Sequence, residues 1–337
     1  MIAPLVATKK RSRAKVRKPI RAMPSSPRRY EYHETVLLRE TVDLLAAQPG
    51  RIIVDGTLGG GGHAEALLAA GARVIGLDQD PEAIAFARQR LGARPDFTAV
   101  RSSFAKAGEV LDSLGIGLVD GVLLDLGVSA RQLDSPERGF SFMHDGPLDM
   151  RMDPAGPISA ADLVNTMSGD QLERIFRHLG EEPAARKIAA KIVRERMVQP
   201  FTTTRQLAEA VEAIIPRRGR THPATRVFQG LRIAVNRELE VLEEGLAVLS
   251  ARLAPGGRFA VLTFHSLEDR IVKTFFKSRA TEFVDRPEWP EARPNPIFIF
   301  KRITHKPVIA SEAEQRANPR SRSAKLRVVE RIPYVRQ

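Results

Sequence analysis

The chain of 337 residues contains no cysteine. That absence excludes disulfide bonds, thiolate zinc sites and cysteine-bound iron–sulfur clusters. It also excludes every reaction that needs a cysteine nucleophile. No apolar run approaches the roughly 18 residues of a membrane span, and the N-terminal segment lacks the apolar core of a secretory signal. These absences favour a soluble cytoplasmic protein.

Acidic residues are missing from residues 1–29, which carry ten lysines and arginines and a charge of +10. Residues 301–337 add +7, so residues 30–300 hold −4 of the net charge of +13. Two basic ends on a slightly acidic body favour a polyanionic partner, of which nucleic acid is the commonest. Little in residues 1–29 can pack, and we expect a disordered basic tail. An organellar presequence is less favoured, because the segment shows no convincing amphipathic stripe.

Apolar runs typical of strands alternate with helical runs through the first half of the chain. The expected strands are 51–55, 73–78, 97–101 and 120–126. The expected helices lie near 64–70, 81–91 and 105–113. This alternation predicts a parallel sheet in an α/β domain.

The pattern changes after residue 135, where several short helices are expected without a strand. Further expected elements are a long helix at about 224–253, a strand at 258–264, a helix at 267–277 and strands near 297–303 and 324–332. We therefore predict a Rossmann-like core, residues 30–135 and 236–337, interrupted by a helical insertion, residues 136–235.

A glycine-rich loop follows the first expected strand. Asp55-Gly-Thr-Leu-Gly-Gly-Gly-Gly-His63 lies between an apolar run and a helical run, which is the opening unit of a nucleotide-binding α/β domain. Gly59, Gly61 and Ala64 fit the dinucleotide spacing, so this motif leaves a nicotinamide oxidoreductase possible.

Acidic residues end three of the expected strands. Asp78 lies 19 residues after Gly59, where a carboxylate accepts hydrogen bonds from ribose hydroxyls. Asp55 and Asp125 end the first and fourth strands. Three carboxylates would repel a pyrophosphate, whereas they suit a cofactor with a cationic centre and a ribose. This argument favours S-adenosylmethionine over a nicotinamide cofactor.

Seven motifs, in order, resemble those of the ribosomal RNA small subunit methyltransferase H family. They are His33–Leu38, Asp55–His63, Leu123–Ser129, Glu137–Phe142, Asp145–Pro154, Thr263–Val272 and Asn318–Ser323. The resemblance covers about residues 32–332. It implies a class I S-adenosylmethionine-dependent methyltransferase fold with an RNA-recognition insertion. The implied activity is methylation of the exocyclic N4 of one cytosine in the decoding region of 16S ribosomal RNA, within the small subunit.

The resemblance also implies a set of cofactor contacts. These are Gly61, Gly62, His63, Asp78, Phe104, Asp125 and Gln132. The residues themselves are compatible with such roles. Loop amides suit a carboxylate, Asp78 suits a ribose, and Phe104 suits the face of an adenine, although a phenylalanine there is also an ordinary core residue.

The absence of cysteine bears on the base chemistry. Methylation at cytosine C5 needs a covalent nucleophile, usually a thiolate, whereas methylation of an exocyclic amine needs only alignment, hydrogen-bond acceptors and a route for one proton. Asp125 is the predicted acceptor and the candidate catalytic residue. The sequence Asp125-Leu-Gly-Val128 lacks the prolines and aromatic residue common in N4-specific DNA enzymes, so this role stays open.

Several further residues are candidates for the substrate side. Phe140 and Phe142 would stack on a flipped base or pack beneath the insertion. Others that would line this side or contact phosphate are His265, Ser266, Arg270, Arg320, Arg322, Lys325, Arg217, Arg218 and Arg220.

No metal site is predicted, because the histidines are scattered and lack a ligand-like spacing. Asp145, Asp149 and Asp153 are expected to be structural hydrogen-bonding partners. A non-catalytic RNA-binding assembly factor with the same fold is the second hypothesis for function. The oligomeric state, monomer or homodimer, stays open.

Overall fold

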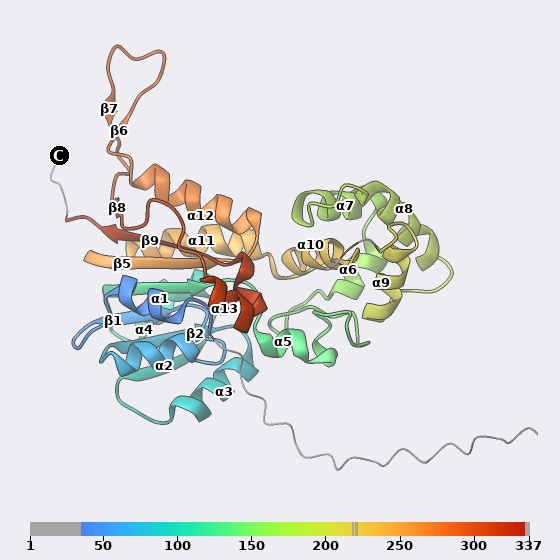
Figure 1. Cartoon of the computed structure of the whole chain (residues 1–337), viewed down its shortest axis with the longest axis horizontal. Helices are drawn as coiled ribbons and strands as arrows, with labels where there is room; N and C mark the ends of the chain where they lie inside the picture. Colours follow the sequence, from blue (N-terminus) through green and yellow to red (C-terminus); the bar gives the residue numbers. More distant parts are fainter. Residues whose placement is uncertain (1–34, 218, 220–221, 334–337) are drawn as a thin grey trace, which may run out of the picture. The chain divides into compact units, whose positions relative to one another are not determined.

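A computed structural model describes residues 35–217, 219 and 222–333, so the tail predicted for 1–29 lies outside the described residues. The strands of its large sheet are β1 (Ile52–Asp55), β2 (Arg73–Asp78), β3 (Phe97–Arg101), β4 (Val119–Asp125), β5 (Leu253–Thr263), β8 (Phe300–Arg302) and β9 (Lys325–Arg331). They are arranged in the order β3-β2-β1-β4-β5-β9-β8 (Figure 1). Strands β1 to β5 pair in parallel, and β9 runs antiparallel to β5 and β8. The predicted α/β class is confirmed.

Helices cover both faces of this sheet. One face packs against α1 (Leu38–Leu45), α2 (Gly62–Ala69) and α3 (Pro81–Leu91), and the other against α4 (Ala107–Ser113), α11 (Glu238–Ala251) and α12 (Ser266–Arg279). Side chains alternate between the two faces along each strand. In β5, Phe259 and Val261 enter one hydrophobic cluster, whereas Ala260 and Leu262 enter the other. Burial on both faces explains why the strands are continuously apolar.

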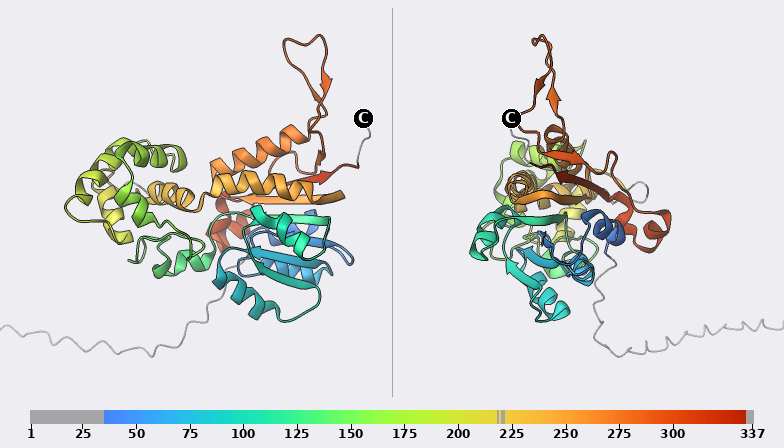
Figure 2. Two further views of the ribbon diagram at one scale, coloured as in Figure 1. Left: turned by 180° about the vertical axis from the view of Figure 1, so that it is seen from behind. Right: turned by 90° about the vertical axis from the view of Figure 1, so that its left-hand side faces the viewer.

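Five helices after β4 share a separate hydrophobic core. They are α6 (Ala160–Thr166), α7 (Gly169–Arg174), α8 (Ala185–Arg196), α9 (Thr204–Glu212) and α10 (Thr225–Asn236), grouped together in the left view of Figure 2. Val164, Ile188 and Leu231 are fully buried among them. Capping boxes begin three of these helices, since Ser159, Ser168 and Thr203 each accept a hydrogen bond from the third helical residue. A π-helical turn, Ile175–Leu179, extends α7.

The single long helix predicted for 224–253 is wrong. The chain forms α10 and α11 instead, with a break at Arg237, which adopts a left-handed conformation at φ 49°. The side chain of Asn236 accepts a hydrogen bond from Met152 N and donates one to Met150 O, both at 2.8 Å. Arg232 and Glu238 form a paired salt bridge across the break at 2.7 and 2.8 Å. These contacts stabilise a bend that the apolar periodicity does not reveal.

Other boundaries differ from the prediction. Strand β5 begins at Leu253 rather than 258, with a register irregularity against β4, and the strand predicted near 297–303 shortens to β8. The unpredicted elements are α1, α5 (Ala130–Asp134), α13 (Glu312–Ala317), short 3₁₀ helices at Phe104–Lys106, Pro136–Arg138 and Pro319–Ser323, and the hairpin of β6 (Phe283–Val284) and β7 (Arg293–Pro294). Over the described part of the chain, no helix has the length and apolar character needed to cross a membrane.

Candidate active site

A cavity of about 400 Å³ opens at the carboxyl ends of β1, β2 and β4. In a parallel α/β sheet, ligands bind at this edge, where the strand order reverses. Six of the seven predicted cofactor residues line the cavity, namely Gly62, His63, Asp78, Phe104, Asp125 and Gln132. The seventh, Gly61, does not. It caps α2 with φ 75° and faces Leu91, so it shapes the loop from behind.

Hydrogen bonds from main-chain amides to side-chain oxygens hold the glycine loop against the strand ends. The amide of Gly59 donates to Asp78 Oδ2 at 2.8 Å. A Cβ atom at Gly62 would collide with the hydroxyl of Thr35. The amide of Asp125 donates to the hydroxyl of Thr57 at 2.6 Å, which fixes the end of β4 against the loop. The loop can approach Thr35 this closely only because residue 62 is a glycine.

Asp78 is oriented by two main-chain donors. Its Oδ2 atom accepts from Gly59, and its Oδ1 atom accepts from Asp80 N at 2.9 Å. Each carboxylate oxygen has a second lone pair. Asp78 thus retains acceptor capacity toward the cavity that it lines, as ribose hydroxyls require. Asp80, rather than Asp78, caps α3 by accepting from Glu82 N at 3.0 Å.

His63 fixes the surroundings of Asp125. Its Nε2 atom lies 3.2 Å from the carbonyl oxygen of Val36, which can only accept, so Nε2 carries the hydrogen. Burial lowers the pKa of His63 to about 4, and the ring is neutral. Its bare Nδ1 atom lies 3.5 Å from Asp125 Oδ2. This nitrogen accepts a hydrogen bond from Asp125 when the carboxyl group is protonated.

Burial raises the proton affinity of all three strand-end acids. Burial, and secondarily the charges of Asp55 and Glu268, raise the pKa of Asp125 to about 8. Burial likewise raises the pKa of Asp55 to about 7 and that of Asp78 to about 6. Asp125 still has 26% of its side-chain surface exposed and lines the cavity. A cationic ligand in the cavity would relieve this destabilisation of the ionised acids.

Among the described residues, each arginine that lines the cavity is paired with a carboxylate. Arg90 is bound to Glu65 at 2.5 Å, Arg232 to Glu238 at 2.7 Å and Arg320 to Asp134 at 3.0 Å. Two buried atoms of lining residues, Asp125 Oδ1 and Arg320 Nη1, have no hydrogen-bond partner in the described structure. This donor and acceptor set fits a sulfonium cofactor better than a pyrophosphate.

Phe104 and Gln132 line the cavity for different reasons. The Phe104 ring lies against α11, where a Cβ atom at Gly245 would overlap it. Gln132 is buried, and its amide is occupied on both sides: it accepts from Ser129 N at 3.0 Å and donates to Asp80 Oδ2 at 3.0 Å. Gln132 therefore shapes the cavity wall, whereas the Phe104 ring offers an apolar face.

The break between α10 and α11 brings residues into the cavity that the sequence interpretation missed. Arg232, Asn236 and Glu238 line it together with Phe264 and Glu268. Arg232, Asn236 and Glu238 were hidden inside the single long helix predicted at 224–253. The one local signal is the polar run Asn236-Arg-Glu238, since asparagine often occupies a helix end.

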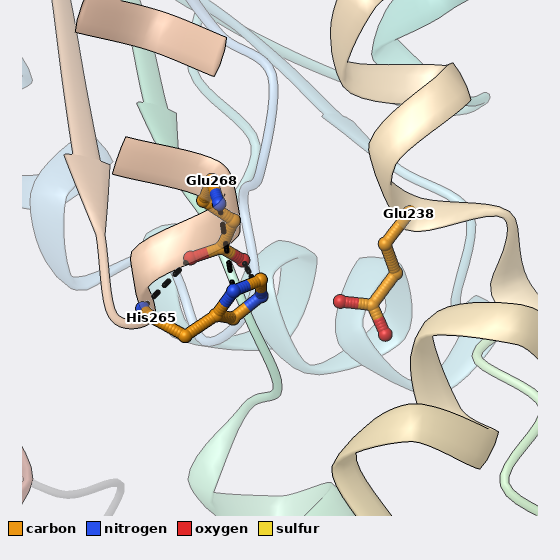
Figure 3. Close-up of side chains that lie close together, drawn as sticks. All are labelled: Glu238, His265 and Glu268. Carbon is orange, nitrogen blue, oxygen red and sulfur yellow. Dashed lines mark hydrogen bonds and ion pairs between the residues drawn. The ribbon is translucent and has the colours of Figure 1, made fainter. Parts of the chain in front are cut away.

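Glu238, His265 and Glu268 place their potential ligand atoms within 4.8 Å of one another (Figure 3). These groups already have partners. Both oxygens of Glu238 accept from Arg232, and Glu268 accepts from the amide of Phe264 at 2.8 Å and lies 3.0 Å from His265 Nε2. A guanidinium on one carboxylate competes with a metal ion, so we do not assign a metal here.

Phe140 and Phe142, predicted either to stack on the target base or to pack, are packed. Phe140 is buried in the core of the insertion. The centre of the Phe142 ring lies 4.3 Å from that of the His222 ring and 4.9 Å from that of the Phe228 ring. Neither lines the cavity.

The basic and polar candidates differ in their surroundings. Lys325 binds Asp269 at 3.1 Å, and Ser266 donates to Glu181 at 2.5 Å. Arg320 lines the cavity, and Arg322 is exposed. Arg218 and Arg220 lie outside the described residues. Asp149 binds Arg151 through both carboxylate oxygens, in keeping with the structural role expected for it.

The sheet order, the antiparallel β9 and the acidic strand ends around a glycine loop define a class I S-adenosylmethionine-dependent methyltransferase. The chain belongs to the MraW methylase family, whose model matches residues 30–332. A Magnetococcus marinus protein named ribosomal RNA small subunit methyltransferase H is 51% identical, with 89% of this chain and 98% of that protein covered. A Myxococcus xanthus protein of the same name is 53% identical, with 89% and 97% covered.

Solved structures resemble this chain more distantly. The crystal structure of an rRNA methylase from Streptococcus thermophilus is 11% identical, with a TM-score of 0.40, over 87% of this chain and 95% of its own. At that level the likeness says nothing further about function. The predicted family, cofactor class and methyltransferase activity are confirmed by the family match and by the relatives.

Proposed function

We propose that this enzyme methylates the exocyclic N4 of a cytosine in the decoding region of 16S ribosomal RNA, in the small subunit and in the cytoplasm. The position of Asp125 in the cavity is the observation that carries the proposal. Its carboxyl group, partly exposed in a cavity with the glycine loop and Asp78, supplies an acceptor for an amine hydrogen. The name of the relatives supports a ribosomal RNA substrate. The absence of cysteine opposes the C5 route.

Each cofactor-facing residue has a proposed role. Asp78 accepts from the ribose hydroxyls, the amides around Gly62 and His63 bind the carboxylate of the methionyl part, and Phe104 packs on the adenine. The cofactor, when bound, supplies the electrophilic methyl group. Gly61 and Gln132 act indirectly, by holding the loop and the cavity wall.

Asp125 would align the target amine and receive its hydrogen. With the cofactor bound, the N4 lone pair would take the methyl group in exchange for its bond to sulfur, and N4 would release one proton. The ionised carboxylate of Asp125 orients the amine and takes this proton, as a positioned general base does. Glu238 and Arg232 also line the cavity, where they would contact the base edge.

The helical insertion, residues 136–235, is proposed to recognise RNA. Its helix α8 carries Arg186, Lys187 and Arg194, which are exposed and have no ion pair in the described structure. Unpaired basic side chains suit phosphate contacts, which position RNA without reading its sequence.

Nucleoside analysis tests the reaction. Labelled S-adenosylmethionine is incubated with the enzyme and with small subunits from a strain that lacks this activity. We expect the label in N4-methylcytidine, at about one methyl group per subunit. Label in 5-methylcytidine or in another nucleoside would contradict the N4 assignment. Cofactor and RNA binding without any transfer would favour the assembly-factor hypothesis.

The raised pKa of Asp125 predicts a pH-dependent stability. Because the pKa is about 8 in the folded protein against 3.8 for an ordinary aspartate, the folded state retains a proton that the unfolded state releases. This stability is present below the unfolded pKa and is lost as the pH rises through the folded value. We expect the Tm of the cofactor-free enzyme to fall between about pH 5 and pH 8.5, and added cofactor to raise Tm most at the upper end.

Asp125→Asn is the control for this effect. An amide does not titrate, so the variant should show a flatter fall of Tm with pH and a cofactor-induced rise that depends less on pH. Differential scanning calorimetry across the pH series measures both. Equal slopes for the variant and the wild-type enzyme would rule out Asp125 as the source.

A further inference from the structure

A second groove, of about 810 Å³, lies between α12 and the segment 281–298, which contains the β6–β7 hairpin. Figure 1 shows this hairpin beyond the end of α12. We call the groove the α12 groove. The residues that line it include Arg270, Lys273, Lys277 and Arg286, and no acidic residue. Such a concentration of positive charge contrasts with the slightly acidic body of the protein.

The basic side chains on α12 form one stripe. Arg270, Lys273 and Lys277 follow the spacing i, i+3 and i+7, which places them on the same side of the helix. All three are exposed, and none has an ion pair in the described part of the chain. At 1.5 Å per residue the stripe extends about 10 Å, which is about the length of three phosphates in a stacked strand.

The opposite wall holds the one tryptophan of the chain. The guanidinium groups of Arg286 and Arg293 lie 5.0 and 4.8 Å from the centre of the Trp289 ring. This contact keeps two cations in place at the end of the hairpin. Aromatic and guanidinium planes are also the groups on which unpaired RNA bases stack.

The wall is anchored to α12. Asn295 is buried, and its side-chain amide donates to the carbonyl oxygens of Ser278 at 2.7 Å and Thr281 at 2.6 Å. The groove is therefore formed in advance of binding, which reduces the entropic cost of binding a ligand. The hairpin also carries four exposed acids, Glu282, Asp285, Glu288 and Glu291, but these do not line the groove.

We propose that the α12 groove binds the ribose–phosphate backbone of the substrate RNA outside the target nucleotide. This inference rests on the proposed ribosomal RNA substrate. The same helix serves both sites, since Glu268, in its first turn, lines the catalytic cavity and Arg270 begins the groove. Backbone contacts there orient the substrate and carry no base specificity.

Charge reversal at the groove tests this role. Lys273→Glu is compared with Arg73→Glu, a matched reversal of an exposed residue at the amino end of β2, outside both cavities. The affinity for protein-free 16S ribosomal RNA and for small subunits is measured over a salt series without cofactor. We expect Lys273→Glu to weaken binding of both by about tenfold and to reduce the salt slope by about one.

Two further readouts separate a binding role from a structural one. Lys273→Glu should raise KM for the subunit with kcat and cofactor affinity unchanged. Trp289→Ala should weaken RNA binding about fivefold or more. Arg73→Glu should match the wild-type enzyme in every assay.

Unchanged RNA affinity and salt slope in both groove variants would overturn the proposal. A loss confined to intact subunits, with protein-free RNA bound normally, would also overturn it in favour of a ribosomal protein partner. Failure of the wild-type enzyme to form N4-methylcytidine, with RNA binding still dependent on Lys273, would instead reject the proposed reaction and leave the groove assignment standing.

Discussion

Replacing Asp125 with asparagine is expected to lower kcat for methyl transfer about a thousandfold, the usual range for loss of a general base. The amide keeps the size of the side chain and one acceptor oxygen, but it cannot take a proton. Cofactor affinity should fall by about tenfold, because a buried carboxylate near a sulfonium is replaced by a neutral group. Single-turnover transfer to small subunits at saturating cofactor measures the chemical step.

Asp120→Asn is a matched control on the same strand. Asp120 accepts from the amide of Ile52 at 2.9 Å at the far end of β4, outside the cavity, and an asparagine oxygen can keep that hydrogen bond. Its kcat should stay within about twofold of the wild-type value. If Asp125→Asn kept kcat within about threefold of wild type, Asp125 would not be the group that takes the proton. Loss of cofactor affinity alone would assign it to binding.

Replacing Arg138 with leucine is expected to lower the free energy of unfolding by about 3–5 kcal/mol, as for other broken buried ion pairs. Arg138 donates to Asp80 Oδ2 at 2.8 Å and to the carbonyl oxygens of Arg151 and Met152, both at 3.0 Å. Both charged side chains are at most 9% exposed. The substitution leaves a buried carboxylate and two carbonyls with fewer partners. Urea unfolding with the linear extrapolation measures the change.

An exposed ion pair provides the comparison. Arg205 lies 3.8 Å from Asp145, with side chains 64% and 36% exposed, and Arg205→Leu should leave the free energy of unfolding almost unchanged. The double variant Arg138→Leu with Asp80→Asn should recover part of the loss, because it removes the uncompensated charge. Similar losses of unfolding free energy for Arg138→Leu and Arg205→Leu would contradict the argument that burial makes the Arg138–Asp80 pair important for stability.

The sequence was most informative where local order and function coincide. Each predicted strand that ends in an acid formed, and Asp55, Asp78 and Asp125 meet at one edge of the sheet because parallel strands end there together. The glycine loop lies where strand and helix adjoin in sequence. These features could be predicted from residues that are neighbours in the sequence.

The features that could not be predicted from the sequence depend on contacts between residues far apart in the chain. The helix break at Arg237 depends on Asn236 binding Met152, 84 residues away, so no window of local periodicity contains its cause. The break carries Arg232 and Glu238 into the cavity. The α12 groove likewise exists only because Asn295 fixes the hairpin to the end of α12.

By itself the sequence determined the α/β class, the acidic strand ends, the methyl-donor cofactor and the family. These depend on backbone periodicity and on residue types at fixed short spacings, both of which are local. Only the tertiary structure decided that Phe140 and Phe142 pack, that the arginines of the cavity are paired and that Asp125 lines the cavity. Burial and partnership depend on which distant segments meet, because a side chain's desolvation and hydrogen bonds are set by its neighbours in space rather than in sequence.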